Sequence, residues 1–269
     1  MKLAVIVTTY NRPDALAAVL DGYAAQEVQS FELIVADDGS TDETRRLVAA
    51  RARQAPYRLR HVWQEDRGFR AAAIRNRALA QTAAEYVIFS DGDCIPSRRF
   101  VARHAALAER GYFVAGNRIL LSERFTEEVL RASLPVHEWP ARKWLMAWLR
   151  RDVNRALPLL DLPDGAFRKR APNRWKGVKT CNLSAWRRDL IAVNGLDESY
   201  CGWGLEDSDL VIRLFRAGVK HKSARFAAPV FHLWHREFDR SRLGENERRL
   251  NEVIGCGRIE ALNGVSQYL

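Results

Sequence analysis

The stretch Glu85-Tyr-Val-Ile-Phe-Ser-Asp-Gly-Asp-Cys94 joins a buried strand to an acidic turn, and the rest of the chain is organised around it. Its aromatic and β-branched residues predict a short buried strand over Tyr86–Ser90. Asp91 and Asp93 then follow with one glycine between them. Oxygen ligands on a tight loop suit a hard divalent cation such as Mg²⁺ or Mn²⁺, and such a cation suits a diphosphate. Because Asp and Gly are also ordinary turn residues, the tripeptide alone does not establish a site.

Strands and helices alternate throughout the residues that precede this stretch. The pattern predicts strands over Leu3–Thr8, Phe31–Asp37 and Leu59–Gln64, and helices over Pro13–Ala25, Thr41–Gln54 and Ala71–Thr82. This alternation predicts an α/β fold with a mainly parallel sheet that helices cover on both faces. Ligands of such sheets bind at the carboxyl ends of the strands.

Polar, aromatic or charged side chains follow each of these strands. They are Thr8, Tyr10 and Arg12 after the first, Asp37 and Asp38 after the second, Arg70 and Arg75 after the third, and Asp91 and Asp93 after the fourth. Any one of them could be an ordinary polar residue of a surface loop, but polar residues at the ends of four consecutive strands predict a site at one edge of the sheet. Neither G-x-G-x-x-G after the first strand nor G-x-x-x-x-G-K-[ST] occurs, which argues against a dinucleotide-binding Rossmann domain and a P-loop nucleotide hydrolase.

The middle of the chain predicts a helix over Ser97–Arg110, capped by Ser97, and a single strand over Tyr112–Leu121. The segment 137–151 then mixes three tryptophans with four Lys or Arg residues. A basic amphipathic helix with tryptophans can lie in a membrane interface. The tryptophans can equally belong to the core, and the sequence does not separate the two interpretations.

The C-terminal third predicts a helix over Glu206–Ala217 that begins with acidic residues. Asp207 shares the apolar face with Val211, and a buried carboxylate is a candidate general base because burial favours proton binding. The simpler interpretation is that the helix dipole favours acids in the first turn. Asp209 precedes Arg213 by one turn, which predicts a solvated ion pair.

His232 and His235 follow a probable strand. A lone histidine there is usually structural, but beside a carboxylate metal site it becomes a candidate ligand. Their spacing does not separate the two histidines.

The composition is globular, with 269 residues, 47% hydrophobic and 28% charged residues. A net charge of +10 indicates an anionic partner such as nucleic acid, a membrane surface or a phosphorylated ligand. The four cysteines are scattered, without C-x-x-C, which predicts reduced thiols of a cytoplasmic protein. The apolar run at the N-terminus is too short for a signal peptide, and no stretch approaches the roughly 18 apolar residues of a membrane span.

Together, the motifs resemble those of the inverting glycosyltransferases of family 2, which have the GT-A fold. Three motifs match that family in order: Val7-Thr-Thr-Tyr-Asn-Arg-Pro13, Ala36-Asp-Asp-Gly-Ser-Thr-Asp42 and Ser90-Asp-Gly-Asp93. Gly68-Phe-Arg-Ala-Ala-Ala-Ile-Arg-Asn76 resembles the bacterial chondroitin-polymerase type, and Gly202-Trp-Gly-Leu-Glu-Asp207 resembles a motif of that type and of β-1,4-galactosyltransferases. Leu205 departs from the motif, which has a second glycine there.

The resemblance implies a role for each candidate residue. Thr8, Tyr10, Arg12, Asp37 and Asp38 would hold the nucleotide, Arg70 and Arg75 would lie near the diphosphate, Asp91 would contact the ribose and metal shell, Asp93 and His232 would bind the metal, Asp207 would be the base, and Glu206 and Trp203 would bind and cover the acceptor.

The resemblance also implies a single GT-A catalytic domain over 1–269, with a nucleotide-sugar-binding half (1–118) and an acceptor half (119–269). The implied reaction is metal-dependent, inverting transfer from a UDP-sugar to a hydroxyl of a cell-envelope glycan or glycolipid, such as lipopolysaccharide core or capsule. Two alternatives are a sugar nucleotidyltransferase and a non-enzymatic module that binds nucleic acid or lipid. Since no RRM, KH or helix-turn-helix signature occurs, we expect no nucleic-acid partner. The segment 137–151 is the expected membrane contact.

Overall fold

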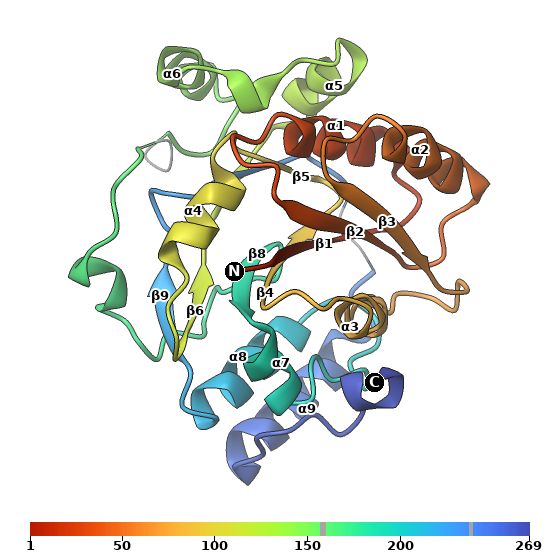
Figure 1. Ribbon diagram of the computed structural model, residues 1–269, viewed down its shortest axis with the longest axis vertical. Coiled ribbons are helices and arrows are strands. Elements are labelled where there is room, and N and C mark those ends of the chain that lie inside the picture. The colour runs from red at the N-terminus through yellow and green to blue at the C-terminus, as the bar shows by residue number, and fades with distance from the viewer. Residues whose placement is uncertain (157–159, 237–238) are drawn as a thin grey trace.

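The computed structural model describes residues 1–156, 160–236 and 239–269, and its largest feature is a twisted sheet (Figure 1). Its strands run in the order β3-β2-β1-β4-β8-β6-β9. Their bounds are β1 Leu3–Thr9, β2 Phe31–Asp37, β3 Arg58–Trp63, β4 Tyr86–Asp91, β6 Tyr112–Ala115, β8 Asn182–Trp186 and β9 Lys220–Ser223. The first four strands pair in parallel, β8 is antiparallel to β4 and β6, and β9 is parallel to β6. The expected α/β class with a mainly parallel sheet is confirmed.

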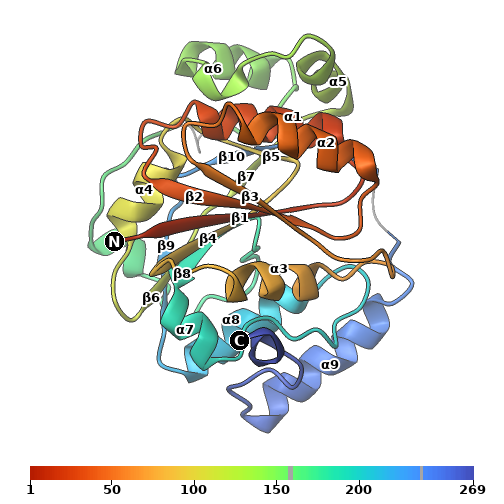
Figure 2. The same ribbon diagram turned by 45° about the vertical axis from the view of Figure 1, so that its right-hand side comes forward.

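Helices cover both faces of this sheet, as Figure 2 shows. One face packs against α1 (Pro13–Ala24), α2 (Asp42–Ala52) and α4 (Phe100–Leu107), and the other against α3 (Ala71–Ala80), α7 (Arg187–Ala192) and α8 (Glu206–Arg216), with α9 (Leu243–Cys256) outside α8. Because side chains alternate along a strand, Val5 and Val7 of β1 face α1, whereas Ile6 faces the other layer.

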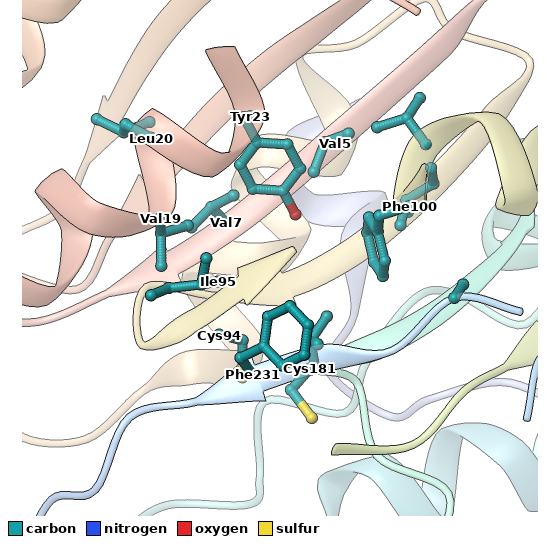
Figure 3. Packing of buried hydrophobic residues seen from close by; sticks show 14 of the residues in the cluster. Val5, Val7, Val19, Leu20, Tyr23, Cys94, Ile95, Phe100, Cys181 and Phe231 are labelled. Carbon is teal, nitrogen blue, oxygen red and sulfur yellow. The ribbon is translucent and has the colours of Figure 1, made fainter. Parts of the chain in front are cut away.

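A second, small sheet lies beside the first, with β10 (Val230–His232) between β5 (Cys94–Pro96) and β7 (Arg118–Leu120). Figure 3 shows Ile95 and Phe231 of this sheet in the same apolar cluster as Tyr23 and Phe100. The register pairs His232 with Cys94. The small sheet therefore places a histidine of the C-terminal third directly beside the acidic turn.

Two predictions about the middle of the chain were wrong. The helix expected over Ser97–Arg110 is shorter and spans Phe100–Leu107. Strand β5 occupies Cys94–Pro96 just before it, and Arg99, not Ser97, takes the N-cap position. The strand expected over Tyr112–Leu121 is divided between the two sheets as β6 and β7. The division falls at Gly116, where a Cβ atom would approach the side chain of Asn182 to 2.4 Å.

The remaining elements are α5 (Glu123–Arg131), α6 (Ala141–Leu149) and the short 3₁₀ turns Val136–Glu138, Ala166–Lys169 and Val265–Tyr268. Figures 1 and 2 place α5 and α6 outside the α1 layer, away from α7–α9. Trp144 is buried and stacks on Phe231 with ring centroids 4.1 Å apart, whereas Trp148 is 45% exposed. Trp144 is thus a core residue, whereas Trp148 is a surface residue whose contact with a membrane stays a prediction.

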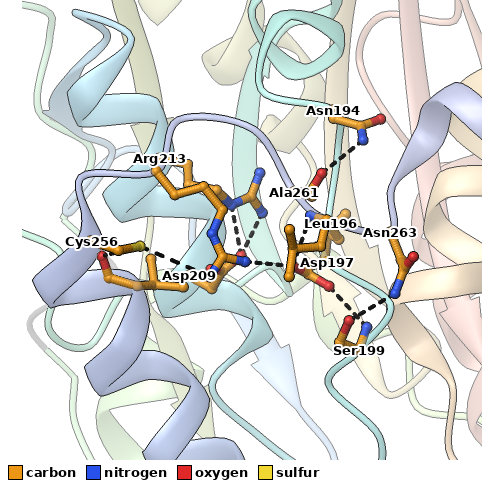
Figure 4. Close-up of polar contacts among 12 residues, drawn as sticks. Asn194, Leu196, Asp197, Ser199, Asp209, Arg213, Cys256, Ala261 and Asn263 are labelled. Carbon is orange, nitrogen blue, oxygen red and sulfur yellow. Dashed lines mark hydrogen bonds and ion pairs between the residues drawn. The ribbon is translucent and has the colours of Figure 1, made fainter.

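The ion pair expected to be solvated in α8 is fully buried, which corrects that prediction. Asp209 and Arg213, whose contact Figure 4 shows, are both inaccessible to solvent. Arg213 also donates to the carbonyls of Val193 and Gly195. The i, i+4 spacing was right, but the loop that precedes α8 covers the pair. Arg213 therefore fastens α8, which carries Glu206 and Asp207 at its first turn, to the 193–195 turn.

Candidate active site

One pocket of about 390 Å³ opens at the carboxyl ends of β1 and β4, the edge at which ligands of parallel sheets bind. Its lining includes these residues that the sequence singled out: Thr8, Tyr10, Arg12, Asp38, Arg75, Asp91, Asp93, Trp203, Glu206, Asp207, His232 and His235. A larger cavity of about 790 Å³ lies at the opposite, amino ends of β1 and β2. The smaller pocket is the candidate site because it lies at the carboxyl ends of the strands and is lined by the residues that the sequence singled out.

Arg75 ties the two sides of this pocket together. It projects from α3 and donates from Nε to Thr8 Oγ1 (2.9 Å), from Nη2 to Asp91 Oδ1 (2.8 Å) and from Nη1 to Glu206 Oε1 (3.3 Å). Burial alone would lower the pKa of Arg75, but the carboxylates of Asp91 and Glu206 raise it above its ordinary value. A permanently charged guanidinium thus joins strand ends β1 and β4 to the first turn of α8.

The pKa of the Glu206 carboxyl group is strongly raised in the folded chain. Burial, followed by the charge of Asp207, raises the pKa of Glu206 from 4.5 to about 7, although Arg75 opposes the shift. Its Oε2 atom is buried and accepts no hydrogen bond from a described residue. Glu206 can therefore carry a proton near neutral pH and offer it to a ligand hydroxyl.

Asp207 is 6% exposed and is held in a fixed orientation. Its Oδ1 atom accepts hydrogen bonds from Thr180 N (3.2 Å) and Thr180 Oγ1 (2.5 Å), and its Oδ2 atom lies 3.8 Å from Lys179 Nζ. Leu205, at the N-cap, has φ +78°, so the departure from glycine occurs at a position that favours glycine.

The acidic turn brings a carboxylate between two histidines. Asp93 Oδ2 lies 3.6 Å from His232 Nε2 and 3.4 Å from His235 Nε2. Burial lowers the pKa of His232 below its ordinary value, although Asp93 opposes the shift. Gly92 is required by close approach, because a Cβ atom there would lie 2.9 Å from Thr9. The structure thus brings both histidines to Asp93 and does not choose between them.

The buried thiols of Cys94 and Cys181 lie behind this turn and complete possible ligand groups with Asp91 and Asp93. All four cysteines are free. Burial raises the pKa of Cys94 well above its ordinary value, which keeps a proton on the sulfur. A protonated thiol is a poor ligand for a hard cation, so the carboxylate and imidazole groups are the better donors.

The candidate nucleotide residues divide by accessibility. Tyr10 is 43% exposed at the pocket rim and donates from its hydroxyl to Asp66. Asp38 Oδ2 accepts from the Arg70 amide at 2.7 Å, and burial raises the pKa of Asp38. Arg12 lines the pocket while it pairs with Asp14.

The structure does not bring Asp37 and Arg70 into the pocket lining. Asp37 is inaccessible and accepts a hydrogen bond from Ser40 N (2.8 Å), while its Oδ2 lies 2.9 Å from His61 Nε2. Arg70 donates to the carbonyl of Glu65 and lines an adjoining cavity that Trp203 shares. Contact of Asp37 and Arg70 with a nucleotide stays a prediction.

Sequence reasoning did not single out Lys179, Thr180, Arg118 or Arg236, which also line the pocket. Lys179 and Thr180 precede strand β8, which begins at Asn182, so they reach the pocket from a loop. Nothing in the sequence near Asp207 indicates that Lys179 and Thr180 would meet it, since they lie in a different segment.

The fold and the site define a protein of the GT-A class of glycosyltransferases. The solved structure of TarS 1–349 from S. aureus matches with a TM-score of 0.65 at 18% identity, covering 100% of this chain and 68% of that one. The mannosyltransferase PcManGT from Pyrobaculum calidifontis matches with a TM-score of 0.61 at 19% identity, covering 87% and 57%.

The sequence comparisons then give the family. The model described as "Glycosyl transferase family 2" matches residues 4–163, and "N-terminal domain of galactosyltransferase" matches residues 165–236. The chain therefore belongs to glycosyl transferase family 2, which confirms the resemblance. Validoxylamine A glucosyltransferase of Streptomyces hygroscopicus subsp. jinggangensis is 32% identical over 226 residues, 81% of this chain and 52% of that protein. Chondroitin synthase of Escherichia coli is 25% identical, over 84% of this chain and 34% of that protein. The chain spans about half the length of the first of these relatives.

Proposed function

We propose that the chain is a metal-dependent, inverting glycosyltransferase that moves a sugar from a UDP-sugar to an acceptor hydroxyl. The observation that carries the proposal is a single pocket that contains both the Asp91–Asp93 turn with its histidines and the buried carboxylate of Asp207. Solved structures of TarS with UDP and with UDP-GlcNAc, and of PcManGT with GDP-Man and Mn²⁺, support a nucleotide-sugar donor.

Asp93, His232 and His235 are the residues that would hold the cation. The ligand atoms of Asp93, Cys94 and His232 all lie within 4.8 Å of one another, which is close enough for one ion. A carboxylate combined with imidazoles suits Mn²⁺ better than Mg²⁺, which prefers oxygen ligands. When bound, the cation supplies positive charge to the departing nucleoside diphosphate.

Asp207 is the proposed base. As the acceptor oxygen bonds to the anomeric carbon, its proton passes to Asp207, and the bond from that carbon to the donor phosphate breaks with its electron pair on the diphosphate. This single displacement inverts the anomeric carbon. Thr180 orients the carboxylate, Glu206 hydrogen-bonds the acceptor, and Trp203 covers the acceptor sugar.

The nucleotide side of the pocket is proposed at Thr8, Tyr10, Arg12 and Asp38, with Asp91 at the ribose. Asp37 supports this side through its hydrogen bond with Ser40. In the proposed division, residues 1–118 bind the donor and residues 119–269 provide the acceptor site and the base.

The proposed acceptor is a cell-envelope glycan or glycolipid that is met at the cytoplasmic face of the membrane. Within the described ranges, no helix has the length and apolar composition of a membrane span. On α6, however, Leu145, Met146 and Leu149 are between 49% and 60% exposed, beside the exposed Arg142 and Lys143. Exposed apolar and basic residues on one helix suit peripheral contact with anionic lipid.

Calorimetric titration with UDP-glucose, UDP-GlcNAc, UDP-galactose and GDP-mannose, with and without Mn²⁺, tests the proposal. We expect a UDP-sugar to bind only when Mn²⁺ is present. In Asp93→Asn, we expect the addition of Mn²⁺ no longer to increase UDP-sugar binding. Pyrophosphate release from UTP and a sugar phosphate would instead indicate a nucleotidyltransferase. Salt-sensitive binding of DNA or RNA without nucleotide-sugar binding would indicate a binding module.

A further inference from the structure

A second cavity, of about 320 Å³, adjoins the candidate active site and is lined by basic residues. Arg118, Lys179 and Cys181 line both spaces. The charged residues around the second cavity are Arg118, Arg155, Arg174, Lys179 and Arg225, and no described lining residue is a carboxylate. The active-site pocket, by contrast, mixes acidic and basic groups. The second space, which we name the basic cavity, is therefore suited to an anion.

Among the described residues, no carboxylate makes a direct ion pair with a guanidinium group of the basic cavity, although Asp91 and Asp93 act on Arg118 electrostatically. Arg118, Arg155 and Arg225 make no ion pair with a carboxylate of any described residue. The side chain of Arg174 donates to the carbonyl of Lys176, at 3.4 Å, which carries no net charge. Several like charges gathered in one concave space repel one another, and a bound anion relieves that repulsion.

The main chain that carries these arginines is well anchored. Arg118 begins β7, and Arg155 follows the bridge that pairs Leu121 with Val153. The carbonyl of Arg225 accepts a hydrogen bond from the buried Arg168 at 2.9 Å. An anion would therefore meet guanidinium groups whose backbone positions are already fixed, which lowers the entropy lost on binding.

We propose that the basic cavity is a subsite for an oxyanion, phosphate or carboxylate, carried by the acceptor. Its lining lies between residues 115 and 225, and none of it comes from β1–β3, whose ends form the nucleotide side of the active site. Lys179 connects the cavity to the proposed base, since its Nζ lies 3.8 Å from Asp207 Oδ2. The acceptor hydroxyl must lie beside that base, so the cavity lies on the acceptor's side.

This inference rests on the proposed function and sharpens its substrate class. Guanidinium groups bind phosphate and carboxylate through paired N–H donors, with more specificity than an ammonium group offers. The acceptor is accordingly an anionic glycan, one that carries a phosphate or a uronic acid near the hydroxyl that is glycosylated. A neutral oligosaccharide leaves the arginines of the basic cavity without a counter-charge.

The test measures binding of three probes to the full chain by calorimetry, with and without UDP and Mn²⁺. The probes are glucose 6-phosphate, glucuronate and the neutral methyl glucoside. We expect the anionic probes to bind in the millimolar range and methyl glucoside at least about tenfold more weakly, because a hydrogen bond between charged groups is the stronger kind. Phosphate and carboxylate are distinguished by whichever of the two anionic probes binds more tightly.

Two variants locate the binding. Arg155→Ser with Arg225→Ser should weaken the anionic probes by roughly tenfold or more, while UDP binding stays unchanged. Arg46→Ser, which removes one exposed positive charge from α2, is the control and should alter neither.

The outcomes separate this inference from the proposed function. If UDP with Mn²⁺ does not bind, the proposed function fails, and the anion titrations without UDP still test the cavity. If UDP binds but the double variant keeps full affinity for the anionic probes, or all three probes bind alike or not at all, the basic cavity is not the subsite. A double variant that instead loses affinity selectively for UDP-glucuronate over UDP-glucose would assign the anion to the donor and overturn the acceptor assignment.

Discussion

Replacing Glu206 with glutamine isolates the energetic consequence of burying this carboxyl group. In the folded chain its pKa is raised from 4.5 to about 7, chiefly by burial. The folded state therefore binds more protons than the unfolded state between these two values. Stability falls as the pH rises through this window, because the folded state must either keep a buried charge or hold a proton that the unfolded chain releases.

The size of the effect follows from the two pKa values. Between pH 5 and pH 8, linkage gives a loss of roughly 2–3 kcal/mol of unfolding free energy from Glu206 alone. Glutamine does not titrate, and its amide oxygen can still accept the hydrogen bond that Arg75 donates. We therefore expect Glu206→Gln to gain roughly 2–3 kcal/mol of unfolding free energy relative to the wild type when the pH is raised from 5 to 8.

Urea unfolding of both chains at several pH values, without divalent cation or nucleotide, measures this difference. Titrating groups that do not interact with Glu206 contribute equally to both chains and cancel in the comparison, provided that unfolding is two-state. Asp209→Asn is not a suitable control, because Asp209 pairs with the buried Arg213. Glu43→Gln, at an exposed position of α2, is suitable and should show no pH-dependent gain. A constant difference between Glu206→Gln and the wild type from pH 5 to 8 would refute the reasoning.

Three further outcomes are expected. Asp207→Asn should lower the rate of sugar transfer by about 100-fold or more while calorimetry still shows UDP binding, since it removes only the proton acceptor; full transfer activity would exclude Asp207 as the base. Leu205→Ala should be less stable in urea than Leu205→Gly by roughly 1 kcal/mol, because a positive φ is unfavourable for alanine but not for glycine; equal stability would show that the backbone at position 205 is not strained. Trp148→Ser should weaken sedimentation with vesicles that contain anionic lipid, whereas Leu262→Ser, equally a surface change, should not; equal losses would argue against contact through α6.

The alternating part of the fold was predictable because its signals are local. Leu3–Thr9 and Phe31–Asp37 contain nearly continuous apolar runs, as strands buried on both faces do, and turns separate them from the helices. The division of Tyr112–Leu121 was not predictable, since the residues on either side favour strand. Its cause is Asn182, a distant residue whose side chain occupies the space beside Gly116 and donates to the carbonyls of Asn117 and Ala228.

In the candidate site, too, the position of some side chains depends on residues that are distant in the sequence. Adjacent residues Asp37 and Asp38 are equivalent in a sequence pattern, but only Asp38 lines the pocket. Asp37 lies within hydrogen-bond distance of His61 on the neighbouring strand β3, and only the pairing of β2 with β3 brings that partner to it. Likewise, His235 lies beyond the end of β10, and the path of the chain there decides that it reaches Asp93.

Arg75 illustrates why a residue near a reaction can be hard to assign by substitution. Its hydrogen bonds to Thr8, Asp91 and Glu206 use three of the five N–H donors of a guanidinium, so donors remain for a diphosphate. Removing the group would leave the buried carboxylate of Glu206 and the half-buried carboxylate of Asp91 without their cation, and breaking a buried pair typically destabilises a fold by about 3–5 kcal/mol. Arg75→Lys keeps the charge, but a single ammonium group cannot hold three partners in the same fork geometry. If Arg75→Lys or a variant without the guanidinium loses activity, two causes are combined: the broken link between the donor and acceptor sides, and the loss of any contact with phosphate. Measuring UDP affinity on a variant shown to be folded separates these two causes.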